Sequence, residues 1–372
     1  MSIAYFAHEL ADPAVQKRVK MLQAGGGDVA LLGFERARFA GDTQTAHVLG
    51  RTANGKLLSR VFSVLLALPR AWRLRTVWGK ADALLARNLE MLAIVTLLTA
   101  LSRSRARIVY ECLDIHRMML AKGPVGAVMR ALERACLARV ALIVTSSPAF
   151  DVHYFRAMQG YRGETLILEN KVLALTGETR AREAPLAGPP WTIAWCGVLR
   201  CRASLQLLRR LADEHSDLVR IELWGAPALD QIPDFHEIVD GSPQMNFHGR
   251  YKPEDLPRIY NCAHFVWAID YYEAGGNSDW LLPNRLYEGL YYGAPPIAVA
   301  GVETARWLAR NKVGIVLDEP LYESAVAVLQ ACTPAQYEAL RRDAQNVDPQ
   351  SVAMTLDACR AMLAHVATGK AA

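Results

Sequence analysis

The chain lacks a cysteine pattern that would cross-link it or bind a metal. Its seven cysteines are an odd number, scattered from residue 112 to residue 359, and their spacings fit neither a disulfide framework nor a zinc site. We expect all seven to be reduced thiols and expect no metal site. That state is typical of a protein of the cytoplasm.

The chain also lacks a segment long and apolar enough to cross a membrane. Its longest apolar runs, residues 61–69 and 91–101, are shorter than the ~20 residues that a membrane-spanning helix needs. Residues 1–10 carry no basic stretch and already include His8 and Glu9, so they resemble a first core strand and not a signal peptide. We therefore expect a cytoplasmic protein.

Two common phosphate-binding motifs are missing. A nicotinamide dinucleotide fold needs a glycine-rich turn directly after its first strand, but no glycine occurs here before Gly25. The G-x-x-x-x-G-K-[ST] motif of P-loop nucleotide hydrolases occurs nowhere in the chain. The sequence therefore supports neither a dinucleotide dehydrogenase nor a P-loop enzyme.

The chain has the composition and periodicity of a two-domain α/β protein. Hydrophobic residues make up 52% and charged residues 21% of its 372 residues, which excludes a disordered or coiled-coil chain and favours two domains. Apolar runs alternate with helix-length segments on both sides of a stretch rich in Ala, Gly and Pro. We expect doubly wound sheets in an N-terminal domain, residues 1–172, and a C-terminal domain, residues 191–372, joined by a linker, residues 173–190.

The apolar runs place the expected strands. They are residues 2–7, 28–33, 81–86, 107–111 and 141–145 in the first domain, and residues 191–195, 219–224 and 263–268 in the second. In a parallel sheet, the carboxyl ends of the strands meet at the edge where ligands bind. Polar side chains that follow these strands are therefore the first candidates for a site.

Positive charge is concentrated in the first half of the chain. Residues 1–171 contain 24 Lys and Arg but 13 Asp and Glu, a net charge of +11, and the second half is acidic. Residues 56–80 carry six basic side chains and no acid, with Trp72 and Trp78 among them, a combination suited to an anionic membrane surface. The alternatives are a core helix with a basic outer face and a nucleic-acid site, for which no recognition motif is present.

The most informative region is residues 271–299. A glycine pair, Gly275 and Gly276, comes before a predicted helix that carries Glu288, ends at Gly293 and leads into a new apolar strand. Glycines before a helix N-terminus let backbone amides approach a diphosphate, and the helix dipole favours its charge. A carboxylate one or two turns into such a helix can bind ribose hydroxyls.

This region resembles the C-terminal signature of the family 4 retaining glycosyltransferases of the GT-B fold, E-x(7)-E followed by G-x-P-[VI]. Glu288 matches the second glutamate, and Trp280 stands at the position of the first. We expect Asp279 or Asn277 to replace the missing glutamate at the sugar hydroxyls. We expect the donor to be bound by Gly275, Gly276, Asn277, Asp279, Asn284, Arg285 and Glu288. For Asn284 and Arg285, the alternative is that they only stabilise the start of the helix.

Two further segments extend the resemblance. Residues 194–200 (AWCGVLR) resemble the strand and loop that open the family's nucleotide domain, which implies that Gly197 lies at the donor. Arg200 and Arg202 would then bind its diphosphate, because the guanidinium fork suits phosphate oxygens. The segment that ends at Tyr251 resembles the base-binding loop of the family.

In this family, a loop of the N-terminal domain next to the reacting sugar often carries a functional His or Asp. Residues 111–117 (ECLDIHR) follow a predicted strand. We therefore expect His116 to hydrogen-bond the donor sugar and Asp114 to orient the sugar or the acceptor, both as catalytic residues together with Glu288. The alternatives are that Asp114 caps the next helix and that His116 is a surface residue.

The acceptor side is expected to be lined by polar residues that follow the first strand, His8, Glu9, Asp12 and Arg18. Asp12 stands before Pro13, so it is equally suited to cap a helix. For Arg18, the alternative is a solvated position on that helix.

The resemblance implies a GT-B fold, with two facing Rossmann-like domains and a cleft between them. It implies a transferase that moves a hexose from a nucleotide diphosphate sugar, of the UDP or GDP type, to a lipid-linked saccharide acceptor in bacterial exopolysaccharide synthesis. Retention of anomeric configuration is implied, without a metal ion or a cofactor beyond the donor, because arginines neutralise the departing diphosphate. Such an enzyme would lie in the cytoplasm, peripheral at the inner face of the cell membrane, and bind no nucleic acid.

Two alternatives stay open at this point. A sugar-nucleotide epimerase of the GT-B type would use the same donor and need no acceptor. A noncatalytic nucleotide-binding scaffold is suggested by Trp280, which replaces a functional glutamate of the family.

Overall fold

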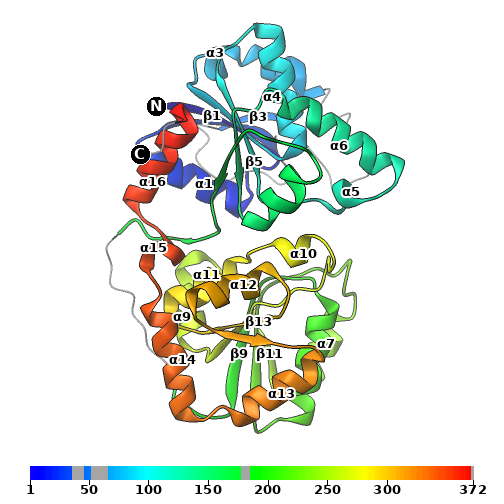
Figure 1. Ribbon diagram of the computed structural model, residues 1–372, viewed down its shortest axis with the longest axis vertical. Helices are drawn as coiled ribbons and strands as arrows, with labels where there is room; N and C mark the ends of the chain where they lie inside the picture. Colours follow the sequence, from blue (N-terminus) through cyan, green and yellow to red (C-terminus); the bar gives the residue numbers. More distant parts are fainter. Residues whose placement is uncertain (36–45, 52–65, 177–184, 370–372) are drawn as a thin grey trace. The chain divides into compact units, whose positions relative to one another are not determined.

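The computed structural model describes residues 1–35, 46–51, 66–176 and 185–369, and the chain divides into two units (Figure 1). The first unit comprises Met1–Glu169, Leu173–Thr176 and Met354–Ala372. The second unit comprises Asn170–Val172 and Gly177–Ala353. Each unit has its own parallel sheet, covered by helices.

The first unit is built on a parallel sheet with the strand order β3-β2-β1-β4-β5-β6-β7. Its strands are β1 (Ser2–Ala7), β2 (Asp28–Glu35), β3 (Ala46–Arg51), β4 (Ala83–Arg87), β5 (Arg107–Cys112), β6 (Leu142–Thr145) and β7 (Glu164–Ile167). Every side chain of β1 after Ser2 is buried. Such a continuous apolar run is typical of a parallel strand that is covered on both faces.

Helices cover both faces of this sheet. They are α1 (Pro13–Ala24), α3 (Arg75–Trp78), α4 (Asn88–Ser102), α5 (Arg117–Leu120), α6 (Pro124–Leu137), a π-helix (Phe150–Arg156) and α16 (Leu356–Thr368). Asp12 caps α1 by accepting a hydrogen bond from the Ala14 N–H, and Pro13 occupies its first position. The C-terminal helix α16, red in Figure 1, packs beside α1 on one face of the sheet.

The second unit repeats the architecture with the strand order β11-β10-β9-β12-β13-β14. Its parallel strands are β9 (Trp191–Leu199), β10 (Val219–Pro227), β11 (Met245–Phe247), β12 (Phe265–Trp267), β13 (Pro296–Val299) and β14 (Ile315–Leu317). A two-stranded sheet of β8 (Val172–Leu173) and β15 (Ala353–Met354) lies where the chain crosses between the units.

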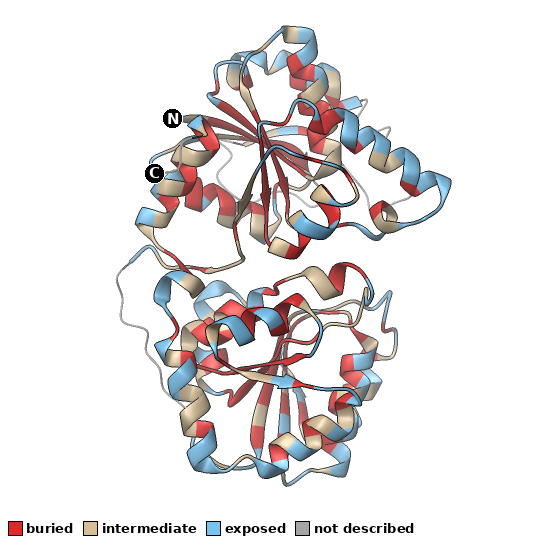
Figure 2. Ribbon diagram, viewed as in Figure 1, coloured by how far each residue is buried: buried red, intermediate tan, exposed pale blue. Residues whose placement is uncertain are grey.

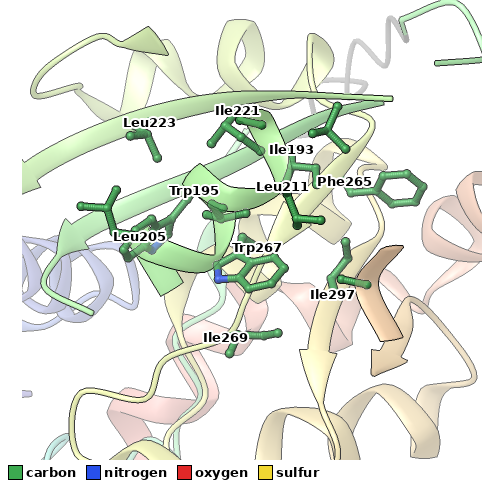
Figure 3. Close-up of a cluster of buried hydrophobic side chains, with 14 of the residues drawn as sticks. Ile193, Trp195, Leu205, Leu211, Ile221, Leu223, Phe265, Trp267, Ile269 and Ile297 are labelled. Carbon is green, nitrogen blue, oxygen red and sulfur yellow. The ribbon is translucent and has the colours of Figure 1, made fainter. Parts of the chain in front are cut away.

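One core cluster of the second unit lies on the face of its sheet that α7 covers. Figure 3 shows Trp195 of β9, Leu223 of β10 and Trp267 of β12 packed with Leu205 and Leu211 of that helix. The helices of this unit are α7 (Arg202–Glu214), α8 (Phe235–Asp240), a 3-10 turn (Pro253–Asp255), α9 (Leu256–Asn261), α10 (Asn277–Trp280), α11 (Asn284–Tyr292), α12 (Glu303–Asn311), α13 (Leu321–Ala331), α14 (Pro334–Asn346) and α15 (Pro349–Val352).

The eight expected strands are all present, with ends that differ by a few residues. The assignment of the C-terminal residues requires a correction, because Met354–Ala372 belongs to the first unit and not to a domain of residues 191–372. The physical reason is apolar packing, since Met362 and Leu363 of α16 join the core formed by β1 and α1. Of the expected linker, residues 177–184 lie outside the described part of the chain.

The position of α16 generates a stability prediction. Leu363 is 3% exposed within the core of the first unit, so Leu363→Ala should lower its free energy of unfolding by about 2–5 kcal/mol. The measurement is urea unfolding followed by circular dichroism. The matched control is Leu101→Ala, because Leu101 is 70% exposed. Equal losses in the two variants would contradict the assignment of α16 to this core.

Candidate functional site

In the second unit, two charged residues follow neighbouring strands and form a pair. Arg200 comes directly after β9, and Asp270 follows β12, which pairs with β9 in parallel. The Arg200 Nη2 lies 3.4 Å from the Asp270 Oδ2. The guanidinium also lies 4.8 Å from the centre of the Tyr272 ring, and the Tyr272 N–H donates to Asp270. Arg200 is therefore held in place but stays partly exposed.

The backbone beside Arg200 leaves room for a ligand. Gly197 of β9 has a φ of +115°, and a Cβ at this position would meet nothing within 4 Å. Its neighbour Gly225 on β10 has a φ of +138°, and a Cβ there would lie 1.7 Å from the Gly197 carbonyl oxygen. Only glycine fits Gly225, and the space over Gly197 is open for close approach of a ligand to the main chain.

Glu288 lies one turn into α11 and is oriented by a tyrosine from another helix. The Tyr260 hydroxyl of α9 donates to the Glu288 Oε2 at 2.7 Å, and Tyr260 is fully buried. Glu288 itself is half-buried. The helix ends at Gly293, which has a φ of +83°, as expected from the sequence.

Arg285 of the same helix is buried close to these groups. Its Nη2 donates to the Ile269 carbonyl at 3.1 Å, and Ile269 directly precedes Asp270. Its Nε is buried and has no hydrogen-bond acceptor among the described residues. Arg200 and Arg285 thus converge on the same turn after β12. Asn284, the first residue of α11, is exposed.

The glycine pair lies before a different helix from the one expected, which was the helix that carries Glu288. Gly275 and Gly276 precede α10, and residues 281–283 separate that four-residue helix from the helix of Glu288. The Gly275 N–H donates to the Asp279 carboxylate at 3.1 Å, so this amide already has an acceptor. Asn277 is fully buried, which contradicts its expected role as a sugar contact.

Arg202 has a partner that the sequence did not indicate. Both of its terminal nitrogens bind the Asp234 carboxylate, with Nη1 at 3.0 Å from Oδ2. The pair lies at the N-terminus of α8, and none of the described contacts of Arg202 involves Asp270 or Tyr272. The expectation that Arg202 acts with Arg200 on the diphosphate therefore requires correction, because the two guanidinium groups are held by different carboxylates, Asp234 and Asp270, and do not meet at the turn after β12.

The segment that ends at Tyr251, which resembles a base-binding loop, contains one member of an aromatic stack. The His248 ring stacks on Trp224 at 3.9 Å, and the Arg258 guanidinium lies 4.9 Å from the centre of the same indole. Tyr251 is half-buried against the cluster that includes Trp224. Burial and the nearby charge of Glu288 raise the pKa of Tyr251, so its hydroxyl stays protonated at neutral pH.

In the first unit, a buried carboxylate joins three elements. Glu111 of β5 is 0% exposed and lies 2.5 Å from the Arg18 Nε of α1 and 3.3 Å from the Arg87 Nη1 of β4. The Tyr5 hydroxyl of β1 donates to the same carboxylate. Burial alone would raise the pKa of Glu111, but the charges of Arg18 and Arg87 lower it below its usual range.

Arg18 is therefore not a solvated helix residue. Arg18 is 6% exposed and belongs to this buried network, in which the charge of Glu111 offsets the cost of burying its guanidinium. Any contribution of Arg18 to an acceptor site would act through the position of Glu111.

His8 and Asp12 extend the network toward the surface. The His8 Nε2 lies 3.3 Å from the Asp12 Oδ2, and the Arg87 Nη2 lies 3.9 Å from the same oxygen. Burial raises the pKa of Asp12, but the hydrogen bond from His8, the charge of Arg87 and the Ala14 N–H together lower it to about 2. Asp12 is thus both a helix cap and part of the network. Glu9, which follows His8 in the sequence, is half-buried.

Asp114 and His116 lie after β5 and are both exposed. His116, and not Asp114, is the N-cap of α5, because its Nδ1 accepts the Met118 N–H at 3.2 Å. The capping alternative for Asp114 is therefore wrong. Since Nδ1 accepts, neutral His116 carries its proton on Nε2 and can donate a hydrogen bond from that atom.

Some residues of both edges were missed by the sequence analysis. They are Asp270, Tyr272 and Tyr260 in the second unit, and Tyr5, Arg87 and Glu111 in the first. Asp270 could have been found, because it is the first charged residue after a predicted strand. The role of Tyr260 depends on packing between two helices, for which the sequence contains no local signal.

The expected lipid anchors in residues 56–80 are partly corrected. Residues 56–65 lie outside the described part of the chain. Trp78 is 0% exposed and its indole N–H donates to the Ala71 carbonyl, so it cannot contact a membrane. Trp72 is half-buried beneath Arg75. No helix in the described ranges is long and apolar enough to span a bilayer.

The seven cysteines are all free thiols, as expected. Burial raises the pKa of five of them, including Cys112, and of these Cys196 to about 12. Within residues 1–35, 46–51, 66–176 and 185–369, no cluster of three His, Cys, Asp or Glu side chains could hold a metal ion.

Comparison with known proteins finds a relative that is similar over nearly the whole chain. No family model matches the chain. The chain is 42% identical to the succinoglycan biosynthesis protein ExoL of Rhizobium meliloti (strain 1021), across 99% of this chain and 94% of that protein.

Solved structures with a similar fold are more distant in sequence. Sucrose-phosphate synthase of Thermosynechococcus elongatus has a TM-score of 0.72 at 13% identity, with 98% of each chain covered. Anabaena HepE in complex with UDP-glucose has a TM-score of 0.71 at 13% identity, with all of both chains covered. WaaG, a glycosyltransferase involved in lipopolysaccharide biosynthesis, has a TM-score of 0.66 at 14% identity, over 99% and 100% of the two chains. These likenesses concern the fold.

The lowered pKa of Asp12 generates a pH prediction. A carboxylate whose pKa is depressed on folding contributes stability above its unfolded value, 3.8, and loses it as the pH falls toward about 2. Asp12→Asn keeps a helix cap but removes the charge, so at pH 6 it should cost on the order of 2 kcal/mol. The difference from wild type should shrink as the pH falls from 5 to 3, measured by urea unfolding. A difference that stays constant over this range would contradict the charge network.

Proposed function

The chain belongs to the family of the succinoglycan biosynthesis protein ExoL and has the GT-B fold of glycosyltransferases, and we propose that it is a retaining, metal-independent hexosyltransferase of exopolysaccharide synthesis. The fold class expected from the sequence is thereby confirmed, as is a glycosyltransferase of polysaccharide biosynthesis. The donor sugar, the acceptor and the stereochemical course belong to the proposal.

The observation that carries the proposal is the fixed cation at the carboxyl edge of the second sheet. Arg200 is held by Asp270 and Tyr272 beside the open main chain at Gly197. A guanidinium that is positioned before the ligand arrives binds a diphosphate without losing much side-chain entropy. Arg285, which is buried beside the same turn, adds a second positive charge there.

The donor in this proposal is a nucleotide diphosphate sugar of the UDP or GDP type. The structurally similar HepE was solved with UDP-glucose, which supports a donor of this class. Glu288 is oriented by Tyr260 and has carboxylate oxygens that can accept hydrogen bonds from sugar or ribose hydroxyls. Asp279 is half-buried and stays a candidate for the contact that Trp280 cannot make.

In the proposed reaction, negative charge develops on the diphosphate beside Arg200 and Arg285. The bond between the anomeric carbon and the diphosphate oxygen breaks, and the acceptor oxygen forms the new bond on the same face of the sugar. Negative charge grows on the departing diphosphate, and Arg200 stabilises it in place of a metal ion. The proton of the acceptor hydroxyl passes to the departing phosphate oxygen, so the step needs no separate side-chain base.

The acceptor side in this proposal is the carboxyl edge of the first sheet. His8, Glu9 and Asp12 follow β1 there. Asp12 pairs with His8 and with Arg87, and Arg87 is in turn held by Glu111. His116, with its Nε2 as a donor, and the exposed Asp114 are proposed to contact the reacting sugar. The acceptor is a lipid-linked saccharide, and the enzyme works at the cytoplasmic face of the cell membrane.

Donor binding should depend on Arg200 and not on Arg202. Arg200→Ala should weaken nucleotide diphosphate binding roughly 10- to 100-fold, because a charge-assisted hydrogen bond contributes about 1.5 to 3 kcal/mol. Arg202→Ala is the matched control, since its guanidinium is paired with Asp234, and its affinity should stay within about threefold of wild type. The measurement is isothermal titration calorimetry with UDP and GDP.

Transfer activity tests the role of Glu288. Glu288→Ala should lose transfer while its circular dichroism and thermal unfolding match those of wild type. Wild-type kinetics in Arg200→Ala and Glu288→Ala would contradict the site, and so would an equal loss of affinity in Arg202→Ala.

Transfer should not require a divalent metal ion. The guanidinium of Arg200 carries the charge that a metal would otherwise supply to the departing diphosphate. Activity assayed after dialysis against EDTA should equal that of the untreated enzyme. Loss of activity with EDTA and recovery with Mg²⁺ or Mn²⁺ would place the enzyme in another mechanistic class.

A further inference from the structure

The helix α6 turns three large apolar side chains outward, although Cys136 and Leu137 in its last turn are buried. Val125, Val128 and Leu132 are 51%, 68% and 49% exposed, and their spacing places them along one side of the helix. Alanines complete this surface, all of them exposed, at Ala127, Ala131, Ala135 and Ala138. Figure 2 shows α6 mostly in the colour of exposed residues. We call this surface the outer face of α6.

The one acidic residue of α6 points inward. Glu133 is 1% exposed and accepts hydrogen bonds from Tyr110 at 2.7 Å, Tyr154 at 2.5 Å and Gln159 at 2.5 Å. Burial raises its pKa above the usual range. At these positions the helix departs from the usual arrangement of a surface helix, which has apolar residues inside and charges outside. We therefore expect the outer face of α6 to be an interaction surface.

The charge around this face is of one sign. Between Asp114 and Asp151, the buried Glu133 is the only acid. The same interval contains five basic residues, Arg117, Lys122, Arg130, Arg134 and Arg139. The neighbouring helix α4 adds exposed Leu97 and Leu101, and Arg103 and Arg105 follow it.

A shallow, open pocket lies where α4 and α6 end. It has a volume of about 260 Å³ and is lined by Thr99, Ser104, Arg105, Ala106, Ile108 and Arg139. Its two arginines belong to the basic surroundings of the outer face. The pocket thus offers cations and a hydroxyl to a phosphate group next to the apolar side chains.

We propose that the outer face of α6 and its basic rim form the surface by which the protein binds an anionic lipid bilayer. Apolar side chains flanked by cations match the acyl and phosphate layers of such a surface. A second copy of the chain fits less well, because a twofold contact would bring basic rim against basic rim. This inference deepens the membrane location proposed above and rests on it, but it does not depend on the donor chemistry.

The proposal is tested by co-sedimentation of the full chain with vesicles of phosphatidylcholine alone and with 30% phosphatidylglycerol. Wild type should bind the anionic vesicles and not the neutral ones. Val128→Gln with Leu132→Gln should lose roughly tenfold or more in partitioning. Lys122→Gln with Arg139→Gln should lose roughly 30-fold, because each basic residue near the surface adds to binding. The control is Leu229→Gln with Val316→Gln, which changes exposed apolar residues of the second unit and should bind as wild type.

Three results would overturn the proposal. They are no binding of wild type to anionic vesicles, equal binding by the α6 variants, or loss only in a variant with Arg70, Arg73 and Arg75 changed to Gln. A dimer of wild type that becomes a monomer in the Val128 and Leu132 variant, seen by analytical ultracentrifugation, would assign the face to a second copy instead. UDP binding by the same variants should equal that of wild type, so failure of the membrane surface is distinguished from failure of the donor site.

Discussion

The structure depends on the burial of parallel strands on both faces, which forces the polar chemistry of each unit to one edge of its sheet. In the first unit, β1, β4 and β5 bring Tyr5, Arg87 and Glu111 together at that edge. A buried carboxylate is tolerated there only because two arginines pair with it, and removal of one partner from such a group costs about 3–5 kcal/mol. The same network fixes Asp12 and His8, so fold stability and the proposed acceptor surface share one set of contacts.

The second unit follows the same rule, with arginines and carboxylates at the carboxyl edge of its sheet. Strands β9 and β12 are neighbours, and the residues after them place Arg200 against Asp270 and Tyr272. Helix α11 brings Glu288 and Arg285 to the turn after β12. Preorganised cations are the feature that a metal-independent transfer of a nucleotide-linked sugar needs, because they stabilise charge without rearranging during the reaction. This edge therefore offers the positive charge that the proposed reaction requires.

The strands were predictable because buried parallel strands leave continuous apolar runs, as in β1, and the end of α11 was marked by Gly293. Three features depend on contacts between distant residues, and no local pattern announces them. Arg202 pairs with Asp234 from another helix, Trp78 packs inside the first unit, and α16 returns to the core of α1 from the end of the chain. The inward Glu133 was visible in the sequence only as an acid on a helix. Its burial follows from Tyr110 and Tyr154, which lie on other elements.

The central claim is that the carboxyl edge of the second sheet binds the donor diphosphate. Hydrogen–deuterium exchange of the full chain with and without saturating UDP or GDP tests it most directly. We predict slower amide exchange in residues 197–203 and 269–289 with whichever of UDP and GDP is the nucleotide part of the donor sugar. Exchange in α6 should be unchanged. Protection confined to the first unit, or no protection with either nucleotide under conditions that support transfer, would contradict the claim.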